Sequence, residues 1–457
     1  MLSRKPFGPS VSSLSVLSLL ALLLVSFLAS PLLAADPVPV AEADSGDTAW
    51  ILVSTALVLF MTIPALALFY GGLVRTKNVL SVLMHCFAMT ALISVLWVVF
   101  GYSVAFSEGT PFLGLDLFGG FEKVLLGGGV RDNLANRPPL DPKILIPETL
   151  FCAFQMTFAI ITPALVIGAF VERMKFLAVM LFSALWLIVV YLPICHMTWG
   201  GGWFSELGVM DFAGGIVVHI TAGVAALVAC IMVGKRKGYP DTQMIPHNLT
   251  YTVIGSAMLW VGWFGFNAGS ALAANGSAAM ALLVTHLSAA TATLTWMLIE
   301  WKGNGKPSVL GAATGAIAGL AAVTPASGFI GPEGGLAIGF TSGALCYFAS
   351  TAVKKRFAYD DSLDVVGVHG VGGFIGVVMV AFFASESLGG SGYAEGVGMG
   401  AQLKAQLIGG GVTVVYTLVA SIAVFWVIDK LVGLRVSDED EEQGLDLAEH
   451  AETGYSL

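Results

Sequence analysis

The stretch DFAGGIVVHI (residues 211–220) places a carboxyl and an imidazole, Asp211 and His219, within an otherwise apolar segment. A second stretch, DVVGVHGVGG (364–373), repeats the arrangement with an aspartate followed by His369. Ionisable side chains inside apolar membrane helices are rare, and they usually line a pathway for ions or protons. The two histidines are therefore candidate functional residues, and the number of helices between them decides the architecture.

The composition indicates an integral membrane protein built from α-helices. Of the 457 residues, 56% are hydrophobic and only 11% are charged, whereas soluble domains average about 25% charged residues. The apolar runs reach roughly 20 residues, the length of a helix that crosses a bilayer. Membrane β-barrels instead show alternating strands of about 10 residues, which excludes that fold. We expect an all-α polytopic membrane protein with 11 transmembrane helices, at 49–72, 78–106, 148–171, 175–197, 212–234, 247–270, 276–300, 308–325, 333–353, 364–384 and 400–432.

The basic residues agree with this number of helices. Cytoplasmic loops of membrane proteins carry an excess of Lys and Arg. If the mature N-terminus lies outside, 14 of the 19 basic residues beyond position 35 fall in or beside the predicted cytoplasmic loops. Four of the other five lie in one long outer loop, 107–147. An odd number of spans then places the C-terminus in the cytoplasm.

The two ends of the chain differ from the transmembrane domain predicted at 48–432. Residues 1–35 combine a basic start, an apolar core and small residues, which is the pattern of a secretory signal peptide. An uncleaved first span is the alternative, and residues 36–47 form the periplasmic N-terminus in either case. The tail at 433–457 is acidic. Such a composition is typical of a solvated end, and it also suits a cytoplasmic docking segment.

The two histidine stretches predict an inverted repeat. The stretch with His219 opens the fifth predicted helix and the stretch with His369 opens the tenth, so the two are five spans apart. Because five is odd, two five-helix repeats face opposite ways across the membrane, and one further helix follows. Inverted repeats place a transport site near the midplane between their halves. At about 1.5 Å per residue, His219 lies roughly 12 Å below Asp211, so the two imidazoles could meet near the centre of the bilayer.

The same side chains also have structural interpretations. A buried histidine can simply bond to a backbone carbonyl, but the pairing of His219 with His369 among glycines favours a pathway. Asp211 and Asp364 stand at helix N-termini, where a carboxylate caps free N–H groups and meets the positive end of the helix dipole. We expect the capping role for both aspartates, with Asp211 orienting the outer end of the pathway indirectly.

The sequence contains no pattern that would hold a cofactor or a metal. The five cysteines fall inside apolar runs without CxxC spacing, so we expect neither a disulfide nor a metal site. We find no phosphate-binding loop. No nucleophile accompanies the histidines, which disfavours an intramembrane hydrolase. We therefore expect a transporter and not an enzyme.

Further stretches show a resemblance to a known family. They are FYGGLVRTKN (69–78), FQMTFAIITPALVIGAFVERMKF (154–176) and WFGFNAGS (263–270). Together with the two histidine stretches they resemble the ammonium transporter family (Amt/Mep/Rh), on its bacterial Amt side, from about residue 48 to the tail. The resemblance implies an eleven-span subunit with its own pore, a homotrimer, and a place in the bacterial cytoplasmic (inner) membrane.

The resemblance also implies an outer ammonium-binding site made by Phe154, Trp199 and Ser270, with Asp211 as the supporting acid. Aromatic faces attract a small cation by roughly 2 kcal/mol or more once water is excluded, and Ser270 offers an oxygen acceptor. Potassium is similar in size to ammonium and would be attracted as well. Selectivity must then come from the loss of a proton, which only ammonium can undergo.

Below this site, the resemblance implies a gate of two stacked rings, Phe158 and Phe266, and a lumen lined by His219 and His369. A charge at the bilayer centre costs from about 2.5 to above 10 kcal/mol, and neutral ammonia avoids that cost. We therefore expect ammonium to be deprotonated near the gate and ammonia to pass the histidines. As a hydrogen-bonded pair they could also relay the proton. The sequence leaves electrogenic transport and passive ammonia conduction open.

Partners and rival functions follow from the same resemblance. The tail resembles the cytoplasmic segment that couples subunits and on which a PII-type signalling protein docks. One rival is an Rh-like passive channel for ammonia or carbon dioxide, against which Trp199 and Ser270 favour an Amt-type site. Another is an ammonium sensor that conducts little. Sensors usually append a signalling domain, whereas 22 residues follow Arg435.

Overall fold

The structure is a computed structural model that describes residues 42–455 apart from positions 110, 113 and 132. The predicted signal peptide, 1–35, lies outside the described residues. Within the described part of the chain, helices are the only extended regular elements, and the β pairing consists of four isolated bridges.

The helices that precede the first histidine, with η marking 3-10 or π-helical segments, are α2 (Ser45–Phe60), η1 (Met61–Leu66), α3 (Ala67–Leu73), η2 (Thr76–Asn78), α4 (Val79–Leu96), η3 (Trp97–Gly101), α5 (Tyr102–Phe106), η4 (Val124–Leu126), α6 (Glu148–Phe170), α7 (Phe176–Trp186), η5 (Leu187–Tyr191), α8 (Leu192–Trp199) and α9 (Trp203–Glu206). The remaining helices are η6 (Gly215–Ile220), α10 (Thr221–Val233), α11 (Leu249–Gly269), α12 (Gly276–Asn304), α13 (Val309–Val323), α14 (Pro332–Phe348), η7 (Ala349–Val353), α15 (Lys354–Phe357), η8 (Val366–Val371), α16 (Gly372–Phe383), η9 (Glu386–Leu388), α17 (Met399–Val432), α18 (Asp438–Gln443) and α19 (Leu445–His450).

Ten helical segments among the described residues are long and apolar enough to cross a membrane. The helix α13 is also apolar, but it has 15 residues. That length corresponds to about 22 Å, which is less than a hydrocarbon core of about 30 Å. The prediction of an all-α polytopic membrane protein is confirmed, and the count of 11 spans stays a prediction that depends on α13.

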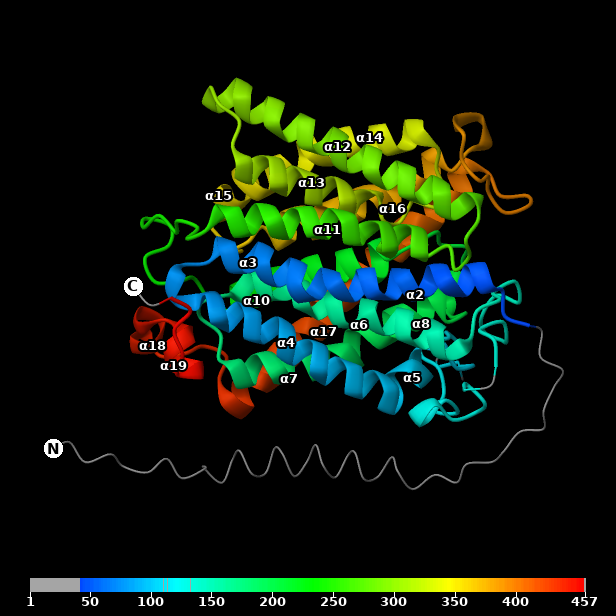
Figure 1. Cartoon of the computed structure of the whole chain (residues 1–457), viewed down its shortest axis with the longest axis horizontal. Helices are drawn as coiled ribbons and strands as arrows, with labels where there is room; N and C mark the ends of the chain where they lie inside the picture. Colours follow the sequence, from blue (N-terminus) through cyan, green and yellow to red (C-terminus); the bar gives the residue numbers. More distant parts are fainter. Residues whose placement is uncertain (1–41, 110, 113, 132, 456–457) are drawn as a thin grey trace.

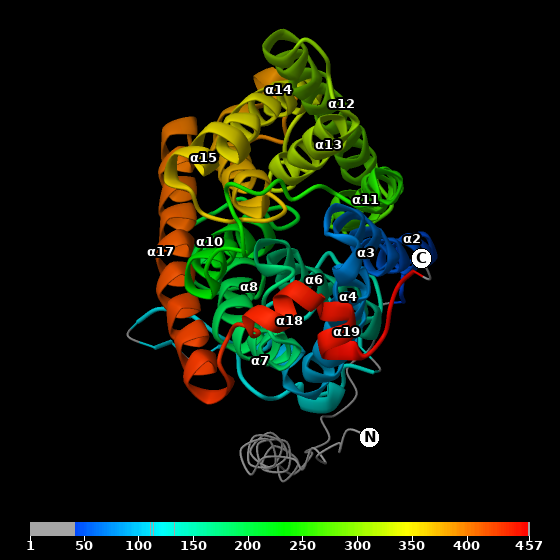
Figure 2. The ribbon, with the colours of Figure 1, turned by 90° about the vertical axis from the view of Figure 1, so that its left-hand side faces the viewer.

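The helices form two groups, and α17 packs along both (Figures 1 and 2). The first group runs from α2 to α10 and the second from α11 to α16. The helix α17 has 34 residues and contacts α7 and α10 of the first group and α16 of the second. The histidine-bearing helices, η6 with α10 and η8 with α16, touch each other where the two groups meet.

Glycines allow these two helices to approach at the level of the histidines. A Cβ atom on Gly223 would lie 2.2 Å from the Cα atom of Gly370, and one on Gly373 would lie 2.7 Å from the Cβ atom of His219. Gly223 follows His219 by four residues, and Gly373 follows His369 by the same spacing, so each glycine lies one turn beyond its histidine. Residues without a side chain permit this close contact between helix backbones.

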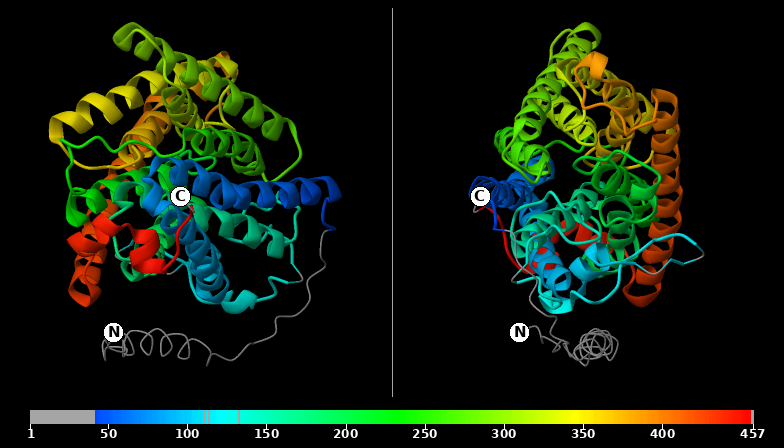
Figure 3. Two further views of the ribbon diagram at one scale, coloured as in Figure 1. Left: turned by 60° about the vertical axis from the view of Figure 1, so that its left-hand side comes forward. Right: turned by 90° about the vertical axis from the view of Figure 1, so that its right-hand side faces the viewer.

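The bundle has two different ends (Figures 1 and 3). The loop 107–147 covers one, which we call the loop end, and α18 and α19 lie across the other, the tail end. In the view onto the tail end, the two short helices cross over α4, α6 and α7 (Figure 2). Glu441 accepts a hydrogen bond from the backbone N–H of Lys237 at 2.7 Å, and Asp446 accepts one from that of Ser81 at 2.8 Å. The acidic tail is therefore docked on the bundle and does not extend into solvent.

Candidate functional site

His219 and His369 are in direct contact inside the bundle. Their Nδ1 atoms lie 3.2 Å apart, and their ring centroids lie 5.2 Å apart with an interplanar angle of 27°. The two residues are 1% and 4% exposed. Each belongs to a π-helical segment, η6 or η8, and such segments frequently mark functional sites. The predicted lumen histidines are thus neighbours, although they come from different groups of helices.

Both imidazoles line a narrow cavity of about 10 Å³. That space is roughly the minimum that holds one water-sized molecule. Most of the remaining wall is apolar, as at Leu165 and Phe266. The Nε2 atom of His219 is buried without a hydrogen-bond partner among the described protein groups. The Nε2 atom of His219 is therefore uncommitted beside a cavity whose wall is mostly apolar.

Trp263, to which the sequence assigned no role, also belongs to this cavity wall. Its ring centroid lies 5.6 Å from that of His219 at an interplanar angle of 30°, and its indole N–H donates to the hydroxyl of Thr324 at 2.9 Å. The indole thus holds one face of the His219 ring. The stretch 263–270 contains this tryptophan, but the sequence does not say which way its ring points.

Phe158 and Phe266 form a lid over the narrow cavity. Their ring centroids lie 4.3 Å apart at 39°, and each residue is 1% exposed. The ring of Phe266 also stacks on His219, with centroids 6.1 Å apart at 19°. Phe266 lines the narrow cavity, whereas Phe158 lines a larger one toward the loop end. The aromatic pair therefore separates the two cavities.

The larger cavity has a volume of about 470 Å³ and is bounded partly by residues 139–142 and by Ile144 of the loop. Trp199, Ser270 and Gln155 line it together with Phe158. The rings of Trp199 and Phe158 meet nearly at right angles, 88°, with centroids 5.9 Å apart. The hydroxyl of Ser270 donates to the carbonyl of Phe266 at 2.8 Å, which leaves its oxygen lone pairs as acceptors. Gln155 is a lining residue that the sequence did not indicate.

Phe154, which the resemblance assigns to the outer site, lies next to the lid ring of Phe158, and its role in binding stays a prediction. Phe154 is fully buried and packs edge-on against Phe158, with centroids 5.0 Å apart at 69°. The residues that line the larger cavity include Phe158 but not Phe154. Phe154 therefore packs directly against the lid ring of Phe158.

Asp211 organises the start of the first histidine-bearing helix. One carboxylate oxygen accepts from the N–H groups of Gly214 and Gly215 at 2.9 and 2.7 Å, and the other accepts from Ile216 and Val217 at 2.8 and 3.2 Å. Burial raises the pKa of this carboxyl, and the four backbone donors oppose the shift. Its backbone carbonyl accepts from the indole N–H of Trp199 at 2.8 Å. Asp211 thus positions both the helix and the tryptophan.

The capping role expected for Asp364 belongs to Asp361. The carboxylate of Asp361 accepts from the N–H of Val366 at 2.8 Å, at the start of η8. Asp364 instead adopts a left-handed backbone conformation, with φ of 63°, and its carboxylate pairs with Lys354 at 2.5 Å. The expectation for Asp364 is wrong because the chain turns at this residue, which directs its carboxylate to the lysine and leaves the cap to Asp361.

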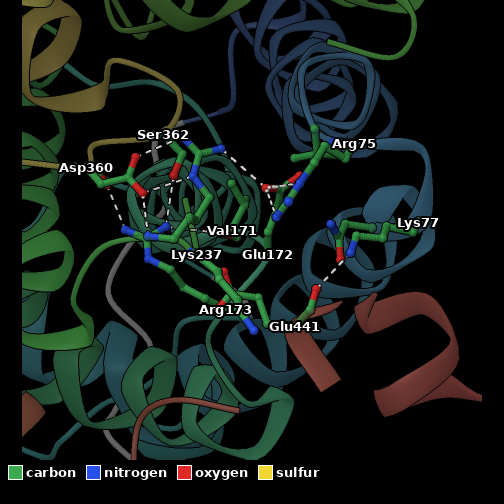
Figure 4. A network of polar contacts seen from close by, with 12 residues as sticks. Arg75, Lys77, Val171, Glu172, Arg173, Lys237, Asp360, Ser362 and Glu441 are labelled. Atoms are coloured by element: carbon green, nitrogen blue, oxygen red, sulfur yellow. Dashed lines mark hydrogen bonds and ion pairs between the residues drawn. The ribbon is translucent and has the colours of Figure 1, made fainter. Parts of the chain in front are cut away.

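A cluster of buried charges holds the tail end together (Figure 4). Arg236 donates to both oxygens of Asp360, at 2.8 and 3.0 Å, and to Glu172 at 3.3 Å. Glu172 also accepts from the side chain and backbone N–H of Arg75, at 2.9 and 2.7 Å. Burial alone would raise the pKa values of Asp360 and Glu172, but the neighbouring arginines lower both.

Arg173 lies beside this cluster and bonds mainly to backbone carbonyls. It donates to the carbonyls of Ala169, Gly234 and Asp360 at 2.9, 2.7 and 2.7 Å. Burial lowers its pKa to about 10. The cluster around Arg236 and Arg173 thus joins the loops that follow α6, α10 and α15.

Ten membrane-length helices among the described residues, an enclosed histidine pair and a cavity that ends at an aromatic lid define a multi-pass membrane transport protein. The family model of the Ammonium Transporter Family matches residues 49–455, and the chain belongs to that family. The resemblance predicted from the sequence is confirmed.

Relatives and solved structures agree with this assignment. The ammonium transporter of Bacillus subtilis is 45% identical over 412 residues, which cover 90% of this chain and 98% of that protein. A putative ammonium transporter of Methanothermobacter thermautotrophicus is 46% identical over 420 residues, with 91% and 99% covered. A structure titled sensor Amt protein has a TM-score of 0.79 at 30% identity, covering 89% of this chain and 98% of that one. Mep2 of Saccharomyces cerevisiae has a TM-score of 0.76 at 33% identity, covering 87% and 89%.

Proposed function

We propose that this protein transports ammonium by binding it in the cavity at the loop end, deprotonating it near the aromatic lid, and conducting ammonia past His219 and His369. The observation that carries the proposal is the narrow cavity of about 10 Å³, which is lined by both imidazoles and lies beneath the Phe158–Phe266 lid. It suits a single small uncharged molecule and offers no carboxylate to a cation.

Recruitment would use the aromatic walls of the larger cavity. Trp199 and Phe158 present ring faces and edges around a common space, and Ser270 adds an oxygen acceptor. An ammonium ion donates up to four hydrogen bonds, and cation–π attraction to such rings is worth about 2 kcal/mol when water is excluded. Asp211 would act indirectly, because its carboxylate is occupied by four backbone N–H groups.

Deprotonation would follow from the electrostatic cost of the apolar interior. A charge there costs from about 2.5 to above 10 kcal/mol, so the neutral species is strongly favoured. The uncommitted Nε2 of His219 supplies a hydrogen-bonding partner for ammonia below the lid. Potassium has no neutral form, so the same step would exclude it.

The proton that ammonium loses would travel separately. The contact of 3.2 Å between the Nδ1 atoms requires one imidazole to donate and the other to accept, so a proton can be exchanged across the pair. Transport would then be electrogenic, since ammonia and a proton both cross.

The cellular setting forms part of the proposal. The loop end would face outward and the docked tail would face the cytoplasm, in a bacterial cytoplasmic (inner) membrane, with 1–35 as a signal peptide. The subunit would assemble as a homotrimer with one pore in each copy. The docked tail and neighbouring loops would offer a surface to a PII-type signalling protein. The proposed activity is transport without chemical conversion by an enzyme.

Two other functions deserve testing. An Rh-like channel would conduct ammonia or carbon dioxide passively. A sensor would bind ammonium and conduct little, and the structural likeness to a protein titled sensor Amt protein favours keeping this alternative.

Reconstitution in proteoliposomes tests these functions against one another. An ammonium pulse should give a current, and methylammonium should accumulate inside. Methylammonium uptake without a current would support the passive channel. Binding without uptake or current would support the sensor.

A further inference from the structure

Asp361 stands in the same relation to His369 as Asp211 does to His219. Each aspartate precedes its histidine by eight residues. Each also accepts a hydrogen bond at 2.8 Å from the N–H five residues ahead, that of Ile216 or Val366. Because the two helices belong to oppositely oriented segments, one carboxyl lies on the loop side of the histidine pair and the other lies on the tail side.

The carboxyl groups of Asp211 and Asp361 differ in the number of hydrogen bonds that they accept. Asp211 accepts from four backbone N–H groups through both oxygens. Asp361 is 1% exposed, and its Oδ1 atom is buried without a hydrogen-bond partner among the described groups. A buried carboxylate oxygen with no donor is costly, and protonation of that oxygen removes the charge.

The groups that surround Asp361 do not neutralise it fully. Lys354 donates to the backbone carbonyl of Asp361 at 2.9 Å and to the carboxylate of Asp364 at 2.5 Å. Asp364 adds a second negative charge nearby. The other titratable groups facing Asp361 are Tyr70, Tyr359 and Cys230. Burial raises the pKa of Asp361 to about 7, with Lys354 opposing the shift and Asp364 adding to it.

The segment that contains Asp361 packs near the wall of the narrow cavity. The N–H of Leu363 donates to the carbonyl of Gly168 at 3.0 Å. A Cβ atom on Gly168 would lie 2.6 Å from a methyl of Val365 and 2.9 Å from the ring of Tyr70. The hydroxyl of Tyr70 donates to the carbonyl of Leu165, at 3.0 Å, and Leu165 lines the narrow cavity. The segment with Asp361 therefore packs against the stretch of α6 next to the histidine cavity.

We propose that Asp361 is the proton-transfer group at the tail end of the pore, an inference that rests on the proposed electrogenic transport of ammonium. The carboxylate takes up the proton relayed from the histidine pair and becomes a carboxylic acid. The lone pair of an emerging ammonia molecule then takes that proton, the O–H bond breaks, and ammonium and the carboxylate are restored. One ammonia molecule and one proton have crossed, and Asp361 is unchanged.

The test compares Asp361→Asn with Asp364→Asn and Asp361→Glu in proteoliposomes. Asparagine keeps the acceptor for the N–H of Val366 but cannot take up the proton. We expect the maximal ammonium-evoked current of Asp361→Asn to fall by roughly 100-fold, the scale of a lost proton-transfer group, with the half-saturating ammonium concentration unchanged. Asp361→Glu should recover part of the current. Asp364→Asn changes the electrostatic surroundings of Asp361 but keeps the proton acceptor, so it should reduce the current far less than Asp361→Asn does.

A second measurement does not depend on the folding of a variant. The current of the unmodified protein should vary with pH on the tail side between about pH 6 and pH 8, where a group poised near neutrality changes protonation. A pH-independent current there, or full current in Asp361→Asn, would overturn the assignment and leave ammonium transport intact. Ammonia flux without any current in the unmodified protein would also overturn it. If the unmodified protein shows neither ammonia flux nor current, the proposed function itself is refuted.

Discussion

The Nδ1 atoms of His219 and His369 lie 3.2 Å apart, although the residues are 150 positions apart in the chain. At this distance one nitrogen donates and the other accepts, so the pair holds one shared proton between its rings. The reciprocal packing of Gly223 and Gly373 against the opposite helix fixes that distance. The contact between the two histidines therefore depends on the close approach of both helices.

The first prediction concerns recruitment at the larger cavity. Trp199→Leu removes the indole that faces Phe158, so about 2 kcal/mol of cation–π attraction is lost. The half-saturating ammonium concentration should rise by about 30-fold, while the maximal current changes little. Trp203→Leu is the matched control, because that ring packs on Phe204 with centroids 5.3 Å apart. If both substitutions have equal effects, Trp199 is not part of the binding site.

The second prediction concerns the helix crossing. Gly223→Ala would force a methyl group to within 2.2 Å of Gly370, whereas Gly411→Ala meets no atom within 4 Å. Overpacking of this kind costs about 1–3 kcal/mol. The melting temperature of Gly223→Ala in detergent should fall and its methylammonium uptake should decrease, with Gly411→Ala unaffected. Normal uptake and stability in Gly223→Ala would mean that the crossing is looser than described.

The third prediction concerns the tail. Glu441 is 1% exposed, accepts the backbone N–H of Lys237, and pairs with Arg435 at 2.5 Å. Glu441→Gln leaves the partly exposed Arg435 without its charged partner, which costs at most about 3 kcal/mol, the value for a fully buried pair. The tail should then be cut faster in limited proteolysis. Glu439→Gln, at an exposed position of the same helix, should leave the cleavage rate unchanged. Equal rates in the two variants would argue against a docked tail.

The fourth prediction concerns stability and pH. Burial raises the pKa of Asp361 from 3.8 to about 7 in the folded protein. The protonated carboxyl therefore favours the folded state, and this contribution is complete below pH 3.8 and is lost as the pH rises through about 7. The loss is up to about 4 kcal/mol. The melting temperature of the unmodified protein relative to Asp361→Asn should thus decrease from about pH 4 to about pH 8. A constant difference would indicate an ordinary pKa for Asp361.

The class of fold and the histidine pair could be predicted because both depend on simple patterns. Long apolar runs in the sequence predict the membrane helices directly. The parity of those runs predicted that the helices bearing His219 and His369 have opposite orientations. The capping role of Asp211 followed from its place before an apolar helix. These inferences need local sequence and helix counting, and no knowledge of distant contacts.

Other parts of the site depend on contacts that a pattern does not encode. Phe154 and Phe158 lie one turn apart on the same face of α6, yet only Phe158 lines the larger cavity, and the spacing of four residues does not reveal this difference. Trp263 on α11 contacts His219 on η6, and the sequence does not reveal that these two helices are neighbours.

The signal for Asp361 was present in the sequence as its spacing of eight residues from His369. Asp364 is closer to His369 in the sequence, so the capping role was assigned to Asp364 and not to Asp361. The left-handed backbone at Asp364 is what separates the two aspartates, and the sequence does not report that conformation.

The central claim is that the paired imidazoles carry ammonia and its proton through the membrane, and the current evoked by an ammonium pulse in proteoliposomes tests it most directly. The unmodified protein should give a current, and the double variant His219→Ala/His369→Ala should give none while remaining folded in the bilayer. A double variant with the full current of the unmodified protein would contradict the account.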